Sequence, residues 1–257
     1  MKPRLWILMA AVAAAIVATF LFPAIPQNEA YHNFADDRPL LGIANCLNVI
    51  SNAPFLLIGL AGIGFVLRGT RAGGKLFLDP RERWPYFAFF VGVALTAFGS
   101  SWYHHQPNDR TLVWDRIPMT IGFMSLVAAV VAERISVRAG IRLLLPLIAL
   151  GAGSVVYWDI TQAHGHGDLR PYAIAQFGSL LVLLLIFALF PARYTRSMDF
   201  VAALAFYGVA KAFEAADKLV FSMGHIVSGH TIKHLFAALS TYWILRMLRL
   251  RRPIHSS

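Results

Sequence analysis

Eight stretches of about 20 mostly apolar residues follow one another along this chain of 257 residues. A helix needs about 20 such residues to cross the hydrocarbon core of a membrane, whereas a membrane β-barrel shows alternating segments of about 10. The stretches lie near residues 5–23, 43–67, 85–105, 112–132, 140–158, 171–191, 199–221 and 229–248. Because the spacers are short, the pattern predicts an all-α integral membrane protein, a seven-transmembrane-helix bundle with one additional N-terminal transmembrane helix.

The amino-acid composition supports this fold class. Charged residues make up 14% of the chain and hydrophobic residues 58%, whereas a soluble domain usually has about a quarter charged residues. The net charge of +10 comes from basic residues in short clusters between apolar stretches. Such clusters are not the basic face of a soluble nucleic-acid-binding module, which is therefore excluded. The single cysteine, Cys46, excludes an intramolecular disulfide and a multi-cysteine metal site.

The basic clusters also predict an orientation. With a cytoplasmic N-terminus, 16 of the 23 Lys and Arg residues fall on the cytoplasmic side, as the positive-inside rule requires. Both termini are then cytoplasmic, and residues 24–42, 106–111, 159–170 and 222–228 face the exterior. We expect the membrane to be a bacterial inner membrane.

The chain divides into three predicted parts. Residues 1–23 are expected to form a transmembrane anchor, with a cleaved signal peptide as the alternative. The anchor is favoured because the apolar stretch is longer than the 7–15 residues typical of a signal peptide and no clear cleavage site follows it. Residues 24–42 form an exterior segment, and residues 43–257 form the seven-helix domain.

Polar residues recur at the predicted exterior ends of three spans. His230 and His234 are four residues apart, so their imidazoles share one helix face. Ser100 and His104 have the same spacing, and Asp115 lies at the start of the next span. Ionisable groups at this depth are costly and are usually functional. Three imidazoles and a water can form a catalytic zinc site, where a nearby carboxylate can take the proton of the water.

These residues resemble the signature of the alkaline ceramidase family. The similar motifs are Ser100-Ser-Trp-Tyr-His104 with Asp115 and Pro118-Met119, Gly229-His230 with His234, and Asn48-Val-Ile-Ser-Asn52. The resemblance covers about residues 31–245. It extends to a wider superfamily of seven-helix membrane hydrolases that includes progestin and adiponectin receptors, but the asparagine motif points to the ceramidase branch.

The resemblance implies that His104, His230 and His234 bind zinc, that Asp115 acts on a metal-activated water, and that Ser100 supports the site. The protein would then be a membrane-embedded, zinc-dependent amidohydrolase that cleaves a ceramide-like lipid amide taken from the bilayer. Residues 43–257 would be its ceramidase-like catalytic domain, with the active site toward the exterior.

The same resemblance raises calcium as a second cofactor. Asp36, Asp37 and Asn45 lie where the family has an acidic, calcium-binding stretch, and they could offer oxygen ligands. Asn45 stands in place of a glutamate, however, and several carboxylates of that stretch are missing. The additional N-terminal span is a further departure from the family.

Two other functions remain open. One is a zinc-containing, lipid-sensing receptor of the same superfamily with little turnover. The other is a proton-coupled transporter that uses Lys211, Glu214 and Asp217. The spacing of these residues and Lys218 also allows an internal ion-pair ladder, which is the structural interpretation.

The remaining histidines are expected to play lesser parts. His105 is the nearest rival of His104, but it does not share the helix face of Ser100. A solvated outer loop is predicted to contain His164 and His166. Surface or interfacial positions are predicted for His32, His225 and His255.

Overall fold

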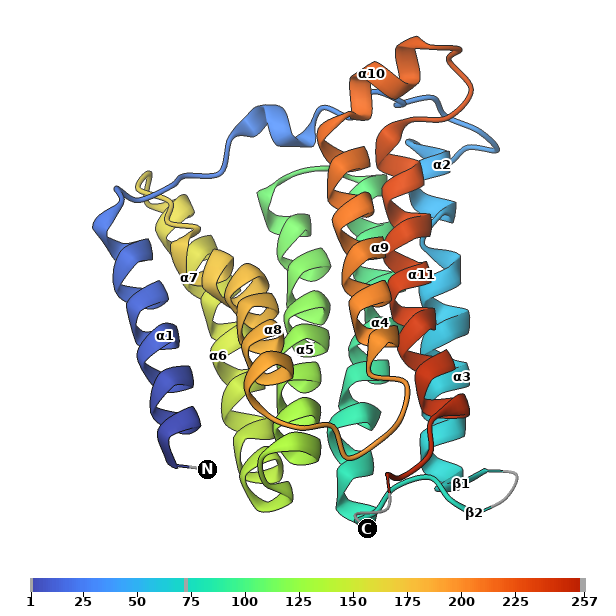
Figure 1. The fold of residues 1–257 in the computed structure, drawn as a ribbon. Helices are drawn as coiled ribbons and strands as arrows, with labels where there is room; N and C mark the ends of the chain where they lie inside the picture. The colour runs from blue at the N-terminus through green and yellow to red at the C-terminus, as the bar shows by residue number, and fades with distance from the viewer. Residues whose placement is uncertain (1, 72–73, 255–257) are drawn as a thin grey trace.

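The computed structural model describes residues 2–71 and 74–254, and these residues form an almost entirely helical bundle (Figure 1). The helices are α1 (Lys2–Leu21), η1 (Glu29–His32), α2 (Cys46–Ile50), α3 (Ala53–Arg68), η2 (Pro80–Glu82), α4 (Arg83–His105), α5 (Asp109–Arg134), α6 (Val137–Ala163), α7 (Arg170–Ala173), η3 (Ile174–Gly178), α8 (Ser179–Leu189), α9 (Met198–Ala215), α10 (Asp217–Ser222) and α11 (Gly229–Leu250). Two short strands, β1 (Thr70–Arg71) and β2 (Gly74–Lys75), pair antiparallel between α3 and η2.

Six helical segments within the described residues are long and apolar enough to cross a membrane. They are Lys2–Leu21, Cys46–Arg68, Pro80–His105, Asp109–Arg134, Val137–Ala163 and Arg170–Leu189. These segments correspond to the first six predicted spans, so the expectation of a helical, multi-pass membrane protein is supported. The full count of seven core spans and one additional span remains a prediction.

Helices α9 and α11, which cover most of the last two predicted spans, are not among these six segments. Helix α9 has 18 residues and includes Asp199, Lys211 and Glu214, and α11 carries basic residues and the paired histidines. The predicted span 199–221 is also not one continuous helix, because α9 ends at Ala215 and α10 begins at Asp217. The prediction of a single helix over these residues was therefore wrong.

Helices that follow one another in the chain pack side by side. Helix α4 contacts both α3 and α5, and α5 contacts α6 and α8. Helix α11 packs along α9 and also touches α3 (Figure 1). Helix α1 lies at the edge of the bundle against α8, and Leu8 is its one buried residue.

Small residues bring the central helices close together. A Cβ atom added to Gly92 of α4 would lie only 2.7 Å from the backbone nitrogen of Gly122 in α5. One added to Gly59 of α3 would lie 2.7 Å from the Cα of Ala94 in α4. Such contacts are typical of helices that associate inside membranes, where small side chains allow backbones to approach.

The two ends of the bundle differ in what they carry. The connections formed by residues 24–42, 106–111, 159–170 and 222–228 lie together at one end, which we call the histidine end, while the chain termini lie near the other (Figure 1). That opposite end contains a buried ionic network in which Glu133 contacts Tyr86 and Arg251, and Glu82 contacts Tyr194. The structure thus groups the four segments predicted to share one side of the membrane.

Candidate metal centre

Three buried histidines converge at the histidine end. His104 comes from the last turn of α4, whereas His230 and His234 come from the first two turns of α11. One ring nitrogen from each residue lies within 4.8 Å of the others. The Nε2 atoms of His104 and His234 are 3.1 Å apart.

This spacing fits the coordination of a metal ion. Zinc binds imidazole nitrogen at about 2.0–2.1 Å, so two tetrahedral nitrogen ligands lie about 3.3 Å apart. In addition, the Nδ1 of His104 is buried and has no hydrogen-bond partner among the described residues. The cluster is therefore a candidate metal centre formed by the three histidines that the sequence analysis named.

The start of α11 is held firmly, which fixes its two histidines. The side chain of Ser228 caps the helix by accepting a hydrogen bond from the backbone N–H of Thr231 at 3.2 Å. A Cβ atom on Gly229 would overlap the carbonyl oxygen of Phe213 in α9. Glycine therefore lets the first turn of α11 approach α9 closely, immediately before His230.

Asp217 joins this turn to the segment formed by residues 24–42. One carboxylate oxygen accepts the backbone N–H of His230 at 2.7 Å, and the other accepts the backbone N–H of Ala35 at 2.9 Å. Both oxygens are thus used to hold backbone. These two hydrogen bonds account for the presence of Asp217 without a role in proton transport.

The asparagine motif ends α2 and precedes α3, and its side chains contact α11 beside the histidines. The Oγ of Ser51 lies 2.7 Å from Nδ1 of His234, and Asn48 accepts a hydrogen bond from the Thr231 hydroxyl at 2.8 Å. Just before the motif, the side-chain amide of Asn45 donates to the carbonyl oxygen of His104 at 2.9 Å. Partners of this kind orient ligand histidines in metal sites. The sequence resemblance identified the motif, but only the structure shows this use of Ser51.

Ser100 and Asp115 are brought together by a close approach of α4 and α5. A Cβ atom on Gly99 would overlap the carbonyl oxygen of Trp114, so the two helices nearly touch at this level. Ser100 and Asp115 are both buried, and their side chains are hydrogen-bonded. Asp115 and His234 line the same cavity.

Part of the segment formed by residues 24–42 covers the histidines. The ring centroid of Phe34 lies 4.6 Å from that of His104 and 4.7 Å from that of His230. Nearby, His32 bonds with its two ring nitrogens to the hydroxyl of Tyr103 and to Asp109, both at 3.0 Å. The prediction of His32 as an ordinary surface residue therefore missed a link between the segment and the bundle.

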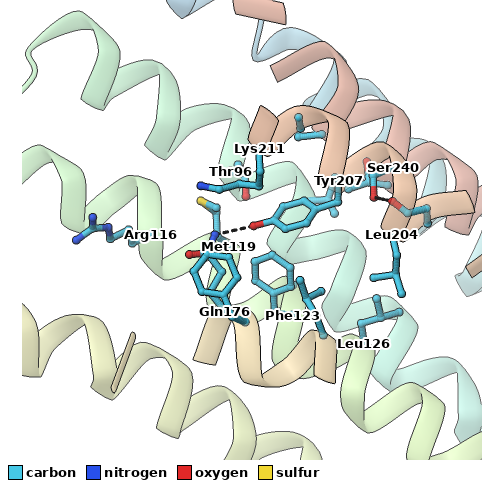
Figure 2. A pocket seen from close by; sticks show the side chains of 18 of the residues that line it. Thr96, Arg116, Met119, Phe123, Leu126, Gln176, Leu204, Tyr207, Lys211 and Ser240 are labelled. Atoms are coloured by element: carbon cyan, nitrogen blue, oxygen red, sulfur yellow. Dashed lines mark hydrogen bonds between the residues drawn. The ribbon is translucent and has the colours of Figure 1, made fainter. Parts of the chain in front are cut away.

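A cavity of about 350 Å³ extends from the histidine end between α5, α8, α9 and α11. Figure 2 labels Phe123 and Leu126 of α5 and Leu204 and Tyr207 of α9 in its lining, and Phe123 packs edge-on against Tyr207 with ring centroids 5.4 Å apart. Polar groups are few, and the amide of Gln176 donates to the Tyr207 hydroxyl at 2.6 Å (Figure 2). A mostly apolar cavity with a few polar groups at one end is typical of a site for a small molecule.

Charged residues gather where the cavity meets the histidines. Glu214 forms ion pairs with Lys211 and, at 2.9 Å, with Lys233 of α11. The Nζ of Lys233 also lies 3.2 Å from Nε2 of His230. The predicted ion-pair ladder is therefore only partly local, because Lys233 supplies the second cation while Lys218 is exposed.

The residues considered for calcium are already engaged. Asp36 is buried and binds the guanidinium of Arg38 through both oxygens, at 2.7 and 2.8 Å. These hydrogen bonds hold the pKa of Asp36 below its usual value. Asp37 is exposed, and Asn45 uses its amide on His104. Among the described His, Cys, Asp and Glu residues, the three-histidine group is the cluster that could hold a metal ion.

The other histidines lie away from the cluster. His105 packs against Trp102, with ring centroids 6.3 Å apart. The exposed loop after α6 contains His164 and His166, whose ring centroids are 6.1 Å apart. His225 packs against Phe221, and His255 lies outside the described residues.

Comparison with protein-family models finds no family that matches the chain, and comparison with curated proteins finds no match either. The fold and the site therefore define the class by themselves. The chain is a helical protein suited to a membrane, with a buried three-histidine cluster at one end of an apolar cavity.

Proposed function

We propose that this protein is a membrane-embedded, zinc-dependent amidohydrolase that cleaves a lipid amide. One observation carries the proposal: His234 of the metal cluster and the buried carboxylate of Asp115 line the same apolar cavity. A metal centre, a general base and a lipid-sized cavity are the parts that such a reaction needs. The motifs shared with alkaline ceramidases support the choice of amides as the substrate class.

The donor set favours zinc over harder ions. Three buried, neutral imidazoles suit Zn²⁺, whereas Ca²⁺ and Mg²⁺ require mainly oxygen ligands. When bound by His104, His230 and His234, zinc would supply Lewis-acid polarisation of the amide carbonyl and a water molecule of lowered pKa. Ser51 would keep the ring of His234 in the orientation and tautomer that binding requires.

Asp115 is assigned the proton transfers. Its carboxylate accepts a proton from the attacking water and passes it to the amide nitrogen as the C–N bond breaks. The water oxygen forms the new bond to the carbonyl carbon, so the products are a fatty acid and an amine. Ser100 holds the carboxylate of Asp115 through their hydrogen bond.

The cavity gives the acyl chain its place. Its apolar lining continues from His234 to Ile244 on α11, ten residues that span about 15 Å of helix. Phe34 covers the opposite face of the cluster and would shield the reacting groups from bulk water. The acyl chain of the lipid therefore lies inside the bundle, and the amide lies beside the histidines.

The proposed function includes an orientation. With the basic connections in the cytoplasm, both termini are cytoplasmic, and the histidine end faces the exterior of a bacterial inner membrane. A transporter based on Lys211, Glu214 and Asp217 has less support, because Glu214 is paired with two lysines and Asp217 binds two backbone N–H groups.

The test is fatty-acid release by the purified protein in detergent, measured on ceramide and on simpler N-acyl amides. The protein is assayed as purified, after chelation, and after zinc is restored. We expect release that chelation abolishes and zinc restores. A protein that binds zinc but releases no fatty acid from any amide would instead favour a receptor, and a protein without affinity for zinc would refute the metal centre.

A further inference from the structure

Arg116, the residue after Asp115, is a buried cation that lines the cavity. Its side chain is only 5% exposed, and Figure 2 shows it extending away from Phe123 and Leu126. One terminal nitrogen, Nη2, donates to Oε1 of Gln27 at 2.6 Å. The other, Nη1, is buried without a hydrogen-bond partner, and no described Asp or Glu forms a salt bridge with Arg116.

Aromatic rings surround the guanidinium group. The Cζ atom of Arg116 lies 4.3 Å from the ring centroid of Trp158, 4.7 Å from that of Tyr172 and 5.8 Å from that of Tyr31. Cation–π contacts offset part of the cost of burying the charge. They do not replace a counter-ion, because a buried charge without an ionic partner remains costly. The rings therefore hold the group in place but do not give it a salt-bridge partner.

No carboxylate of the cavity forms a salt bridge with Arg116, although Asp115 is near enough to interact with it electrostatically. The cavity lining contains three cations, Arg116, Lys211 and Lys233, and two carboxylates, those of Asp115 and Glu214. Glu214 is shared by the two lysines. Asp115 is hydrogen-bonded to Ser100 and is assigned to proton transfer. The lining is therefore net positive even before a metal ion is bound.

We propose that the lipid amide carries an anionic group, a carboxylate or a phosphate, and that Arg116 binds this group. The inference names the substrate class of the proposed hydrolase, so its catalytic part rests on that function, whereas anion binding does not. The acyl chain lies along the apolar lining, which extends away from the histidine end. The anionic group therefore belongs to the amine half of the substrate, as in an N-acyl amino acid or an N-acyl amine that bears a phosphate.

The kinetic test compares three substrates with one acyl chain: N-palmitoylglycine, O-phosphorylated N-palmitoylethanolamine and neutral N-palmitoylethanolamine. We expect the wild-type protein to have a higher kcat/KM for at least one anionic substrate than for the neutral one, and the two anionic substrates show which group is preferred. Arg116→Gln is expected to lower the ratio of anionic to neutral kcat/KM by about 10–100-fold, the usual value of a hydrogen bond to a charged group. Arg116→Lys keeps the charge and should lower this ratio less.

Arg110→Gln is the matched control, because Arg110 is exposed on the same helix, and it should leave the ratio unchanged. A wild-type preference for the neutral amide would overturn the proposal without any variant. So would an unchanged ratio in Arg116→Gln.

A binding measurement separates this proposal from the proposed hydrolysis. Ligands that bind only the folded protein raise its unfolding temperature, and at equal concentration the tighter ligand raises it more. In an Asp115→Asn background, N-palmitoylglycine should raise this temperature more than N-palmitoylethanolamine, and the difference should disappear when Arg116→Gln is added. Arg116-dependent binding without hydrolysis by the wild-type protein would retain the anion site and refute the hydrolase. Hydrolysis of neutral amides without selective binding of N-palmitoylglycine would retain the hydrolase and refute the anion site.

Discussion

The hydroxyl of Ser51 lies 2.7 Å from Nδ1 of His234, while Nε2 of the same ring lies 3.1 Å from Nε2 of His104. One edge of the imidazole is thus fixed by Ser51, which lies between α2 and α3, and the other edge points into the histidine cluster. In metal sites such an outer contact sets the tautomer and orientation of the ligand, and its loss typically costs 10–100-fold in metal affinity.

Ser51→Ala is therefore expected to weaken zinc binding by about 10–100-fold while leaving the fold intact. Zinc affinity is measured by competition with a chelator. Ser101→Ala provides the control, because Ser101 bonds to the backbone oxygen of Val49 instead of a histidine. Equal zinc affinity in wild type and Ser51→Ala would show that the contact does not orient a ligand.

Removal of any one histidine of the cluster should abolish stoichiometric zinc. We expect about one zinc per chain in the wild-type protein and a large loss in His104→Ala, His230→Ala and His234→Ala, because two imidazoles leave too few ligands. His105→Ala is the control, since His105 packs against Trp102 outside the cluster. Metal analysis of the purified variants decides this, and zinc lost from His105→Ala but kept in His104→Ala would reverse the ligand assignment.

Asp115→Asn separates metal binding from chemistry. The amide cannot accept the proton of the attacking water, so fatty-acid release should fall by about 10²–10⁴-fold while zinc content stays at the wild-type level. Zinc content and fatty-acid release are measured on the same sample. Loss of zinc in this variant would mean that the carboxylate supports a ligand, and full activity would remove it from the mechanism.

The orientation can be tested with single cysteines in a Cys46→Ala background. Arg110→Cys and His166→Cys place exposed thiols at the histidine end, and Arg138→Cys places one at the opposite end. The first two should react with a membrane-impermeant reagent in intact cells, and the third only after permeabilisation. The reverse pattern would put the histidine end in the cytoplasm.

Acid should release residues 24–42 from the bundle. The pairing with Arg38 holds the pKa of Asp36 below its ordinary value of about 4. Its stabilising effect is therefore complete above that value and is lost as the pH falls through the lower pKa of the folded state. Arg38 also donates to the carbonyl oxygens of His225 and Ile226, so protonation of Asp36 weakens the contact between residues 24–42 and the loop before α11.

We expect pepsin to cut residues 24–42 faster as the pH falls from 5 to 2, beyond the change in pepsin activity on an unfolded reference. Asp36→Asn should raise the cleavage rate already at pH 5. Asp79→Asn disrupts a similar pair with Arg81 at the opposite end and should not. Equal rates for the two variants would show that Asp36 does not hold the segment.

The features that the sequence predicted most reliably are those that depend on helical periodicity. Long apolar stretches identified the first six spans, and spacing together with the family resemblance named the three histidines that converge. In contrast, nothing periodic marks residues 24–42, so the cover formed by Phe34 and the link formed by His32 were not predicted. The break between Ala215 and Asp217 was also missed, because no proline or glycine marks it in the sequence.

Polar contacts between residues far apart in the chain could not be predicted from the sequence either. The contact of Ser51 with His234 joins residues that are 183 positions apart, and no local pattern predicts it. The isolation of Arg116 is a property of the whole cavity, since it depends on which carboxylates are already engaged. The charges counted along the chain show an excess of basic residues, but they do not show which cation lacks a salt bridge to a carboxylate.

The origin of the three histidines in two distant helices has a consequence for folding. His104 and His234 are 130 residues apart in the chain, and an ion shared between them would close that loop. Closing long loops removes entropy from the unfolded chain, which is how a disulfide stabilises a protein. With Cys46 as its single cysteine, this chain cannot form such a covalent staple within itself. A bound metal would provide such a link and hold α4 and α11 together as the bundle forms.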